Sequence, residues 1–136
     1  MVVTVIALVS AAAMLALPDP AGRVRDEAER FAARTRAAQS EAIVAAAPVS
    51  VWITTGGYGF DQRRAGGWTP IGERQFGVER WKEGTRAELP VAGGRTRITF
   101  DPTGFADQPL ELRLTRDRAV ALVHIDADGS VQVDAG

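Results

Sequence analysis

The hydrophobic pattern divides the chain into three parts, and the first is an uncharged run from Val2 to Leu17. Its polar side chains, Thr4 and Ser10, can bond back to a helix backbone. As a helix of about 1.5 Å per residue it covers roughly 24 Å, somewhat less than the roughly 30 Å hydrocarbon core of a bilayer. We therefore expect residues 1–17 to be the transmembrane half of a long N-terminal helix. The side chains expected to contact lipid or other helices are Val5, Ile6, Leu8, Val9, Met14 and Leu15.

A cleavable signal peptide is the alternative interpretation of this run. Ala11, Ala12 and Ala13 offer the small residues of a cleavage site. A signal peptide also requires Lys or Arg before its apolar stretch, however, and here none precedes it. We therefore favour a retained membrane helix.

The second part, residues 18–47, has the pattern of an amphipathic helix. Pro18 and Pro20 remove amide donors and predict a kink at its start. Helix-compatible residues then continue from Arg23 to Ala47, where Pro48 ends the helix. Steps of four and three define a stripe that should pack on a sheet: Val24, Ala28, Phe31, Thr35, Ala38 and Ala42. Charge pairs on the other faces should serve solubility: Arg23 with Glu27, Arg25 with Glu29, and Asp26 with Arg30.

The third part, residues 48–136, alternates with a period of two, which predicts β-strands. The expected strands are Val49 to Ile53, Tyr58 to Arg64, Arg95 to Phe100, Leu110 to Thr115, Ala119 to Asp126 and Ser130 to Asp134. A less regular stretch begins at Trp68, and residues 70–84 are expected to be mostly loop. Because the turns are too short for helical crossovers, the strands should pair antiparallel in one sheet or two. The fold class is therefore α+β, with 18–136 forming one globular unit.

Composition narrows the range of functions. The chain has 136 residues, of which 46% are hydrophobic and 24% charged, as expected for one folded domain. Its net charge of -1 gives no general attraction to nucleic acid or anionic lipid. Cysteine is absent, which excludes disulfides, thiol nucleophiles and cysteine zinc sites.

Residues that could carry chemistry each have a simpler structural explanation. His124 is the single histidine of the sequence and lacks a second one for a metal site. Asp126, Asp128 and Gly129 lack the closing Glu of a calcium loop and suit a hairpin turn. Asp101 opens an Asp-Pro-x-Gly sequence, as a type I turn prefers. We therefore expect no catalytic, cofactor or metal site.

Glycines and basic residues near the first strands have two interpretations each. The sequence GGYG at Gly56 to Gly59 lacks the lysine of a phosphate loop, so a hairpin is favoured. Arginines beside aromatic residues could bind single-stranded nucleic acid, but a solvated sheet face is favoured. These residues are Arg63, Arg64, Arg95, Arg97, Tyr58, Phe60 and Trp68. We expect the tryptophans, Trp52, Trp68 and Trp81, to be core or sheet-edge anchors, one or two of which could serve a partner interface.

The order of the three parts resembles that of type IV pilin-like proteins, in which a helix that is apolar and then amphipathic precedes an antiparallel sheet. The EA-rich passage from Leu17 to Ile53 resembles the helix and first strand of H-type pseudopilins of type II secretion (GspH/FimT-like). The sequence from Thr99 to Gly104, TFDPTG, resembles the Phe-x-Pro-x-Gly turn of that family. Each motif is weak alone, and their order and spacing carry the resemblance.

The resemblance implies a structural subunit and no enzyme. Such a protein is anchored in the bacterial inner membrane through residues 2–17, with its C-terminal domain in the periplasm. It joins other minor and major pseudopilins near the pseudopilus tip, on an inner-membrane secretion platform. The alternative is a minor type IV pilin that binds DNA for uptake. Because Asp126 to Gly136 contains three Asp and no Lys or Arg, we expect no nucleic acid partner.

The sequence departs from the family pattern at its start. The basic leader, the Gly cleavage site and the Phe-Thr-Leu-Ile-Glu motif have no counterpart before Val2. We expect about seven to ten further mature residues upstream, a length that would also complete the short apolar run. The resemblance implies processing by prepilin peptidase and methylation of the mature N-terminus. Neither can therefore be assigned to a residue of this sequence.

Overall fold

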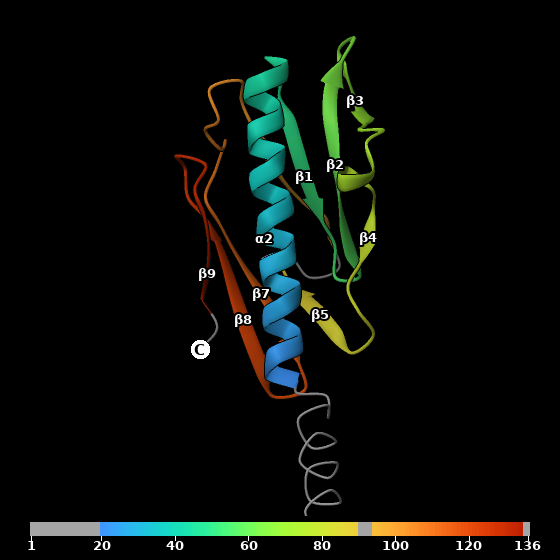
Figure 1. Cartoon of the computed structure of the whole chain (residues 1–136), viewed down its shortest axis with the longest axis vertical. Helices are drawn as coiled ribbons and strands as arrows, with labels where there is room; N and C mark the ends of the chain where they lie inside the picture. The colour runs from blue at the N-terminus through green and yellow to red at the C-terminus, as the bar shows by residue number, and fades with distance from the viewer. Residues whose placement is uncertain (1–19, 90–93, 135–136) are drawn as a thin grey trace, which may run out of the picture.

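The computed structural model describes residues 20–89 and 94–134, in which one helix, α2, lies across two antiparallel sheets (Figure 1). Helix α2 spans Pro20–Ala45. The chain is already helical at Pro20, before the predicted start at Arg23. The predicted helix is thus confirmed, while the predicted kink at Pro18 lies outside the described residues.

The C-terminal end of α2 is closed by a Schellman motif. The Ala46 N–H donates to the Ile43 carbonyl at 3.3 Å, and the Ala47 N–H donates to the Ala42 carbonyl at 3.2 Å. Ala46 takes a left-handed φ of 51° in this turn. Because a Cβ is crowded in that conformation, Ala46 occupies a position that glycine would fill without strain.

The first sheet has the strand order β3-β2-β1-β6, and β4 pairs with the start of β2. The strands are β1 (Val49–Ile53), β2 (Gly57–Arg64), β3 (Gly67–Pro70), β4 (Glu79–Arg80) and β6 (Thr96–Phe100). In the central strand, Val51 stands opposite Phe60 on one side and Ile98 on the other. All three are buried, so this row of the sheet faces the core.

The second sheet has the strand order β5-β7-β8-β9. Its strands are β5 (Thr85–Glu88), β7 (Leu110–Arg116), β8 (Ala119–Ile125) and β9 (Val131–Asp134). Leu110, Leu112 and Leu114 alternate with exposed residues, as the period of two predicts. The predicted antiparallel pairing is confirmed, in the form of two sheets.

In the middle of the chain one expectation is wrong and one strand was missed. The stretch from Trp68, expected to be irregular, is strand β3, whose Gly and Pro residues are accepted because β3 lies at a sheet edge. Strand β5 was not predicted, since only four residues alternate there. Residues 70–84 are mostly loop, as predicted, but contain a short 3-10 helix, η1 (Arg74–Phe76), and β4.

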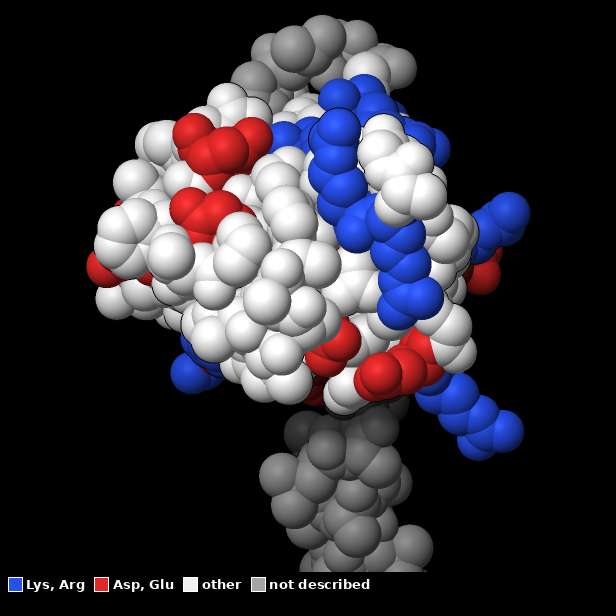
Figure 2. All heavy atoms as spheres, turned by 90° about the horizontal axis from the view of Figure 1, so that it is seen from above, with Lys and Arg blue, Asp and Glu red and all other residues white. Residues whose placement is uncertain are grey.

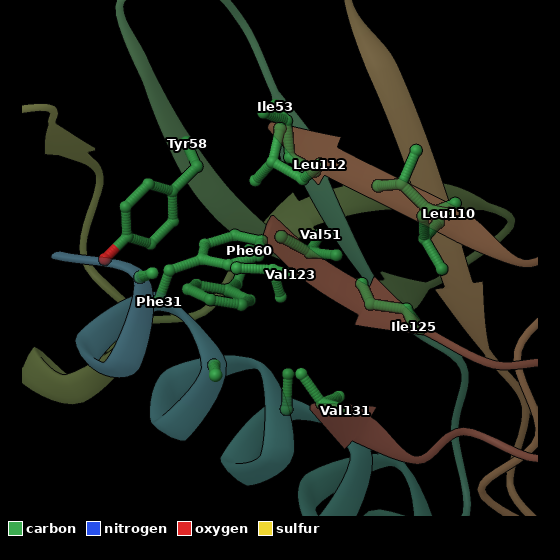
Figure 3. Close-up of a cluster of buried hydrophobic side chains, with 14 of the residues drawn as sticks. Phe31, Val51, Ile53, Tyr58, Phe60, Leu110, Leu112, Val123, Ile125 and Val131 are labelled. Carbon is green, nitrogen blue, oxygen red and sulfur yellow. The ribbon is translucent and has the colours of Figure 1, made fainter. Parts of the chain in front are cut away.

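The core lies between α2 and the inner faces of both sheets (Figure 3). Phe31 of α2 points toward Tyr58 and Phe60 of β2, and Val123 and Ile125 of β8 continue the same cluster. A single apolar core therefore holds the helix and the two sheets together. Within the described residues, no helix has both the length and the apolar character to cross a membrane.

Candidate functional site

Helix α2 is held on the two sheets by an apolar stripe. The six residues predicted to pack there are each exposed by 1% or less: Val24, Ala28, Phe31, Thr35, Ala38 and Ala42. The buried strip is also wider than the sequence suggested, because Ala32 is fully buried and Glu27 nearly so. Alanines dominate it, so the helix backbone lies close to the sheets.

The largest side chain on the stripe, Phe31, anchors a cluster of aromatic rings. Its ring lies 4.9 Å from the Tyr58 ring in an edge-to-face arrangement and 5.7 Å from the Trp81 ring. Tyr58 also contacts Phe60, whose ring lies 5.6 Å from that of Phe76. The cluster therefore joins α2 to β2 and to the loop segment that follows β3.

Arg34 fixes that loop segment to the helix from the polar side. Its guanidinium donates to the Gln75 carbonyl at 2.8 Å and to the Gly77 carbonyl at 2.6 Å. It also donates to the Tyr58 hydroxyl at 3.1 Å and pairs with the Glu79 carboxylate at 2.9 Å. One side chain thus satisfies several groups of a loop that has little secondary structure of its own.

The hydroxyl of Tyr58 lies where this polar network meets the core. Burial raises the pKa of the phenol above its ordinary value of 10.0, and the hydrogen bond and charge of Arg34 oppose that rise. Tyr58 therefore stays neutral at physiological pH and keeps a hydroxyl that can accept the Arg34 hydrogen bond.

Three more polar side chains of α2 bind backbone groups of distant segments. Glu27 Oε1 accepts the Lys82 N–H at 3.0 Å, and Gln39 Nε2 donates to the Gly104 carbonyl at 2.8 Å. Arg36 Nη2 donates to the Val131 carbonyl of β9 at 2.7 Å. The helix therefore holds loops and strands of both sheets by hydrogen bonds as well as by its apolar stripe.

These bonds correct the interpretation of the helix charges as solubility pairs at four-residue spacing. Glu27, expected to pair with Arg23, is buried against the Lys82 amide. Arg30, expected to pair with Asp26, instead pairs with Glu79 at 3.0 Å. Because both partners come from residues far along the chain, no local sequence pattern indicates them.

Unlike the polar side chains of α2 described above, Thr35 has a hydroxyl without a hydrogen-bond partner among the described residues. Thr35 is also fully buried. A buried hydroxyl without a partner costs about 1–3 kcal/mol. The position therefore lowers the stability of the helix-to-sheet interface.

Asp101 opens a tight turn, as its sequence predicted. Its Oδ1 accepts hydrogen bonds from the Thr103 N–H at 2.8 Å, the Phe105 N–H at 3.1 Å and the Thr103 hydroxyl. The Thr103 hydroxyl bond, with the backbone bonds, lowers the pKa of this exposed carboxyl below its ordinary value of 3.8. Gly104 closes the turn with a φ of 91°, which favours glycine.

The acidic sequence considered for calcium forms the predicted hairpin turn. The Gly129 N–H donates to the Asp126 carbonyl at 2.9 Å, and Asp128 Oδ1 accepts from the Ser130 hydroxyl at 2.7 Å and the Ser130 N–H at 2.9 Å. The two bonds from Ser130, that of its hydroxyl first, lower the pKa of Asp128 below its ordinary value of 3.8. Across the described ranges, no cluster of three His, Cys, Asp or Glu residues could hold a metal ion.

His124 lies on β8, opposite Glu111 of β7. Its Nδ1 is 3.8 Å from a Glu111 carboxylate oxygen, and both side chains are partly exposed. His124 therefore lies in a cross-strand pair on the surface of the sheet, at the sheet position that the sequence predicted.

The aromatic residues near GGYG separate onto two sides of the first sheet. Tyr58, Phe60 and Trp81 are buried on the inner side, where they join the core. Trp52 and Trp68 are only partly buried. The alternative of a single-strand binding surface is therefore not favoured, because Tyr58 and Phe60 are buried and only Trp68 of its aromatic residues is partly accessible.

The six residues expected to pack in the membrane, Val5, Ile6, Leu8, Val9, Met14 and Leu15, lie outside the described residues. A family model described as "Type II transport protein GspH" matches residues 27–129. No curated protein sequence matches the chain.

Solved structures from two bacteria share this fold. The minor pseudopilin EpsH from the type 2 secretion system of Vibrio cholerae matches with a TM-score of 0.71 at 20% identity, over 86% of this chain and 98% of that chain. A second structure of EpsH gives 0.68 at 18% identity, over 84% and 94%. The type IV minor pilin FimU of Pseudomonas aeruginosa strain PAO1 gives 0.65 at 14% identity, over 83% and 89%. The predicted pilin-like α+β fold is confirmed by these matches.

Proposed function

Because this chain belongs to the GspH family of type II transport proteins, we propose that it is a minor pseudopilin, a structural subunit of a type II secretion system. Its mechanism is packing between subunits and involves no catalytic turnover. Its partners are other minor and major pseudopilins near the pseudopilus tip, together with the inner-membrane secretion platform.

The observation that supports this proposal most is the attachment of α2 to both sheets. The helix is bound by a buried stripe and by two arginines: Arg34 binds Tyr58 of the first sheet, and Arg36 binds Val131 of the second. A force applied along the helix is therefore transmitted to the whole domain. That property suits a subunit that is moved and packed through its N-terminal helix.

The same proposal assigns a place to each part of the chain. Residues 1–17 form the membrane half of the helix, which later packs among helices of neighbouring subunits. Residues 18–47 form its amphipathic half, and 48–136 form the β domain. We place 18–136 in the periplasm as one unit, anchored in the inner membrane through 2–17.

A secretion assay in the native host tests this function. Deletion of the gene should leave the exported proteins of the system in the periplasm, and the unaltered gene should restore their secretion. A conservative change, Val9→Leu, should also restore secretion. Val9→Arg should not, because an arginine at the centre of an apolar helix opposes membrane insertion and helix packing.

Two results would contradict the proposal. Normal secretion in the deletion strain would exclude a role in this system. Full restoration by Val9→Arg would exclude the assigned membrane and packing role of residues 1–17.

A further inference from the structure

The outer face of the first sheet, on the side opposite to α2, carries a group of arginines and tryptophans. Along β1, β2 and β6, the residues that alternate with the core positions lie on this face. Seen from the end of the domain, basic side chains form a stripe on one side of the molecule (Figure 2). We call this set of residues the arginine–tryptophan face: Trp52, Trp68, Arg63, Arg95 and Arg97.

Trp52 lies flat on the sheet because its cross-strand neighbour is Gly59. A Cβ built on Gly59 would stand 2.3 Å from the Trp52 ring, so only glycine leaves room for the indole. Arg95 covers the ring of Trp52, with its Cζ 4.5 Å from the ring centroid. The two faces of this indole are therefore occupied, one by the sheet and one by a guanidinium group.

Trp68 has the same kind of arginine partners. The Cζ atoms of Arg63 and Arg97 lie 5.6 Å and 5.1 Å from its ring centroid. A guanidinium group held against an aromatic ring keeps its N–H groups free at its edge, and its position is partly fixed in advance. The face therefore presents oriented hydrogen-bond donors.

The positive charge of this face is only partly neutralised. Arg97 pairs with Asp61 at 3.1 Å and also donates to the Ser50 hydroxyl. For Arg63 and Arg95, no ion pair is found among residues 20–89 and 94–134. The face thus holds exposed cations that a partner could neutralise.

An apolar recess adjoins the face at Trp52. It is a shallow groove of about 360 Å³, lined in part by Trp52, Gly57 and Val78. Val78 is 70% exposed and adds apolar surface to this recess. Such a recess beside charged groups is the usual composition of a protein-binding surface.

We propose that the arginine–tryptophan face docks an acidic surface of a neighbouring protein subunit. Planar guanidinium groups with free edges match carboxylates in a bidentate geometry. Single-stranded nucleic acid would instead need bare aromatic faces for its bases to stack on, and here arginines cover the rings of Trp52 and Trp68. The identification of the partner as a subunit rests on the proposed function, whereas the preference for carboxylates rests on the geometry alone.

A binding experiment with defined probes tests the proposal on the full chain in a neutral detergent. The probes are fluorescently labelled poly-L-glutamate and an oligothymidylate of equal charge, and anisotropy is measured at physiological salt. Poly-L-glutamate should bind the unaltered chain more tightly than oligothymidylate. Arg63→Gln and Arg95→Gln should each weaken its binding about threefold to tenfold, and higher salt should weaken it further.

The matched control is Arg86→Gln, because Arg86 is an exposed arginine of β5 in the other sheet. It should leave binding unchanged, and all three variants should keep the melting temperature of the unaltered chain. Equal effects of the three changes, no binding of poly-L-glutamate, or tighter binding of oligothymidylate would each overturn the proposal. The secretion assay does not depend on the binding of poly-L-glutamate, so the proposed function is tested separately.

Discussion

Replacement of Phe31 by alanine tests how strongly α2 is bound to the sheets. Phe31 is fully buried, and its ring packs against the rings of Tyr58 and Trp81. Loss of a buried phenylalanine side chain costs about 3–5 kcal/mol, because apolar burial is lost and a cavity remains. Since small domains unfold with about 5–15 kcal/mol, this change should remove a large part of the total stability.

Urea unfolding of the full chain in a neutral detergent, followed by tryptophan fluorescence, measures this loss. The matched control is Phe105→Ala, because Phe105 is 57% exposed and the same truncation there should cost less than about 1 kcal/mol. Equal losses of unfolding free energy in the two variants would refute the claim that Phe31 anchors the helix.

Other predictions concern single positions. Ala46→Gly should raise the unfolding free energy by about 0.5–1 kcal/mol, because Ala46 has a left-handed φ, whereas Ala33→Gly at an exposed position inside the helix should lower it. Thr35→Val should stabilise the domain by about 1 kcal/mol in the same urea assay, since it removes an unpaired buried hydroxyl at nearly constant volume; a loss of stability would indicate that the hydroxyl has a partner. Arg34→Gln should speed amide hydrogen exchange in residues 73–79 without a similar change at Val131. The pKa of Asp101 is lower in the folded state than its ordinary value of 3.8. Its ionised carboxylate therefore stabilises the fold above pH 3.8, and this stabilisation is lost as the pH falls through the folded-state pKa. Asp101→Asn should therefore make melting temperature less dependent on pH in that acidic range.

The regular elements could be predicted because their patterns are local. The stripe from Val24 to Ala42 repeats at helical spacing, and the leucines of β7 alternate at every second position. The turns at Asp101 and Asp126 are indicated by side chains that bond to their own backbone. In each case the residues that decide the structure are neighbours in sequence.

The remaining features depend on contacts between residues far apart in sequence. Arg34 is a residue type expected on the solvent-exposed face of a helix, yet it donates hydrogen bonds to carbonyls more than forty positions away. Phe76 and Trp81 lie in a segment without periodicity and are buried because the aromatic cluster covers them. Strand β3 forms because β2 offers an edge, although its Gly and Pro residues disfavour a strand.

The separation of Trp52 from the core likewise has only a weak signal in sequence. Trp52 alternates with the buried Val51 and Ile53, which indicates the outer face. That the indole lies flat, however, depends on Gly59 of the next strand and on Arg95. The candidate interaction surface therefore could not be assembled before the strand register was known.

Helix α2 is an integral part of the folded domain, and the proposed function depends most on this claim. Two shortened chains test this claim, one beginning at Ala21 and one beginning at Pro48, compared by urea unfolding and sedimentation. The chain from Ala21 keeps the stripe and every described strand, so it should be monomeric and unfold cooperatively. The chain from Pro48 should aggregate, because both sheets would expose the apolar faces that α2 covers. If the chain from Pro48 were monomeric and as stable as the chain from Ala21, the helix would not be part of the domain and the account would be contradicted.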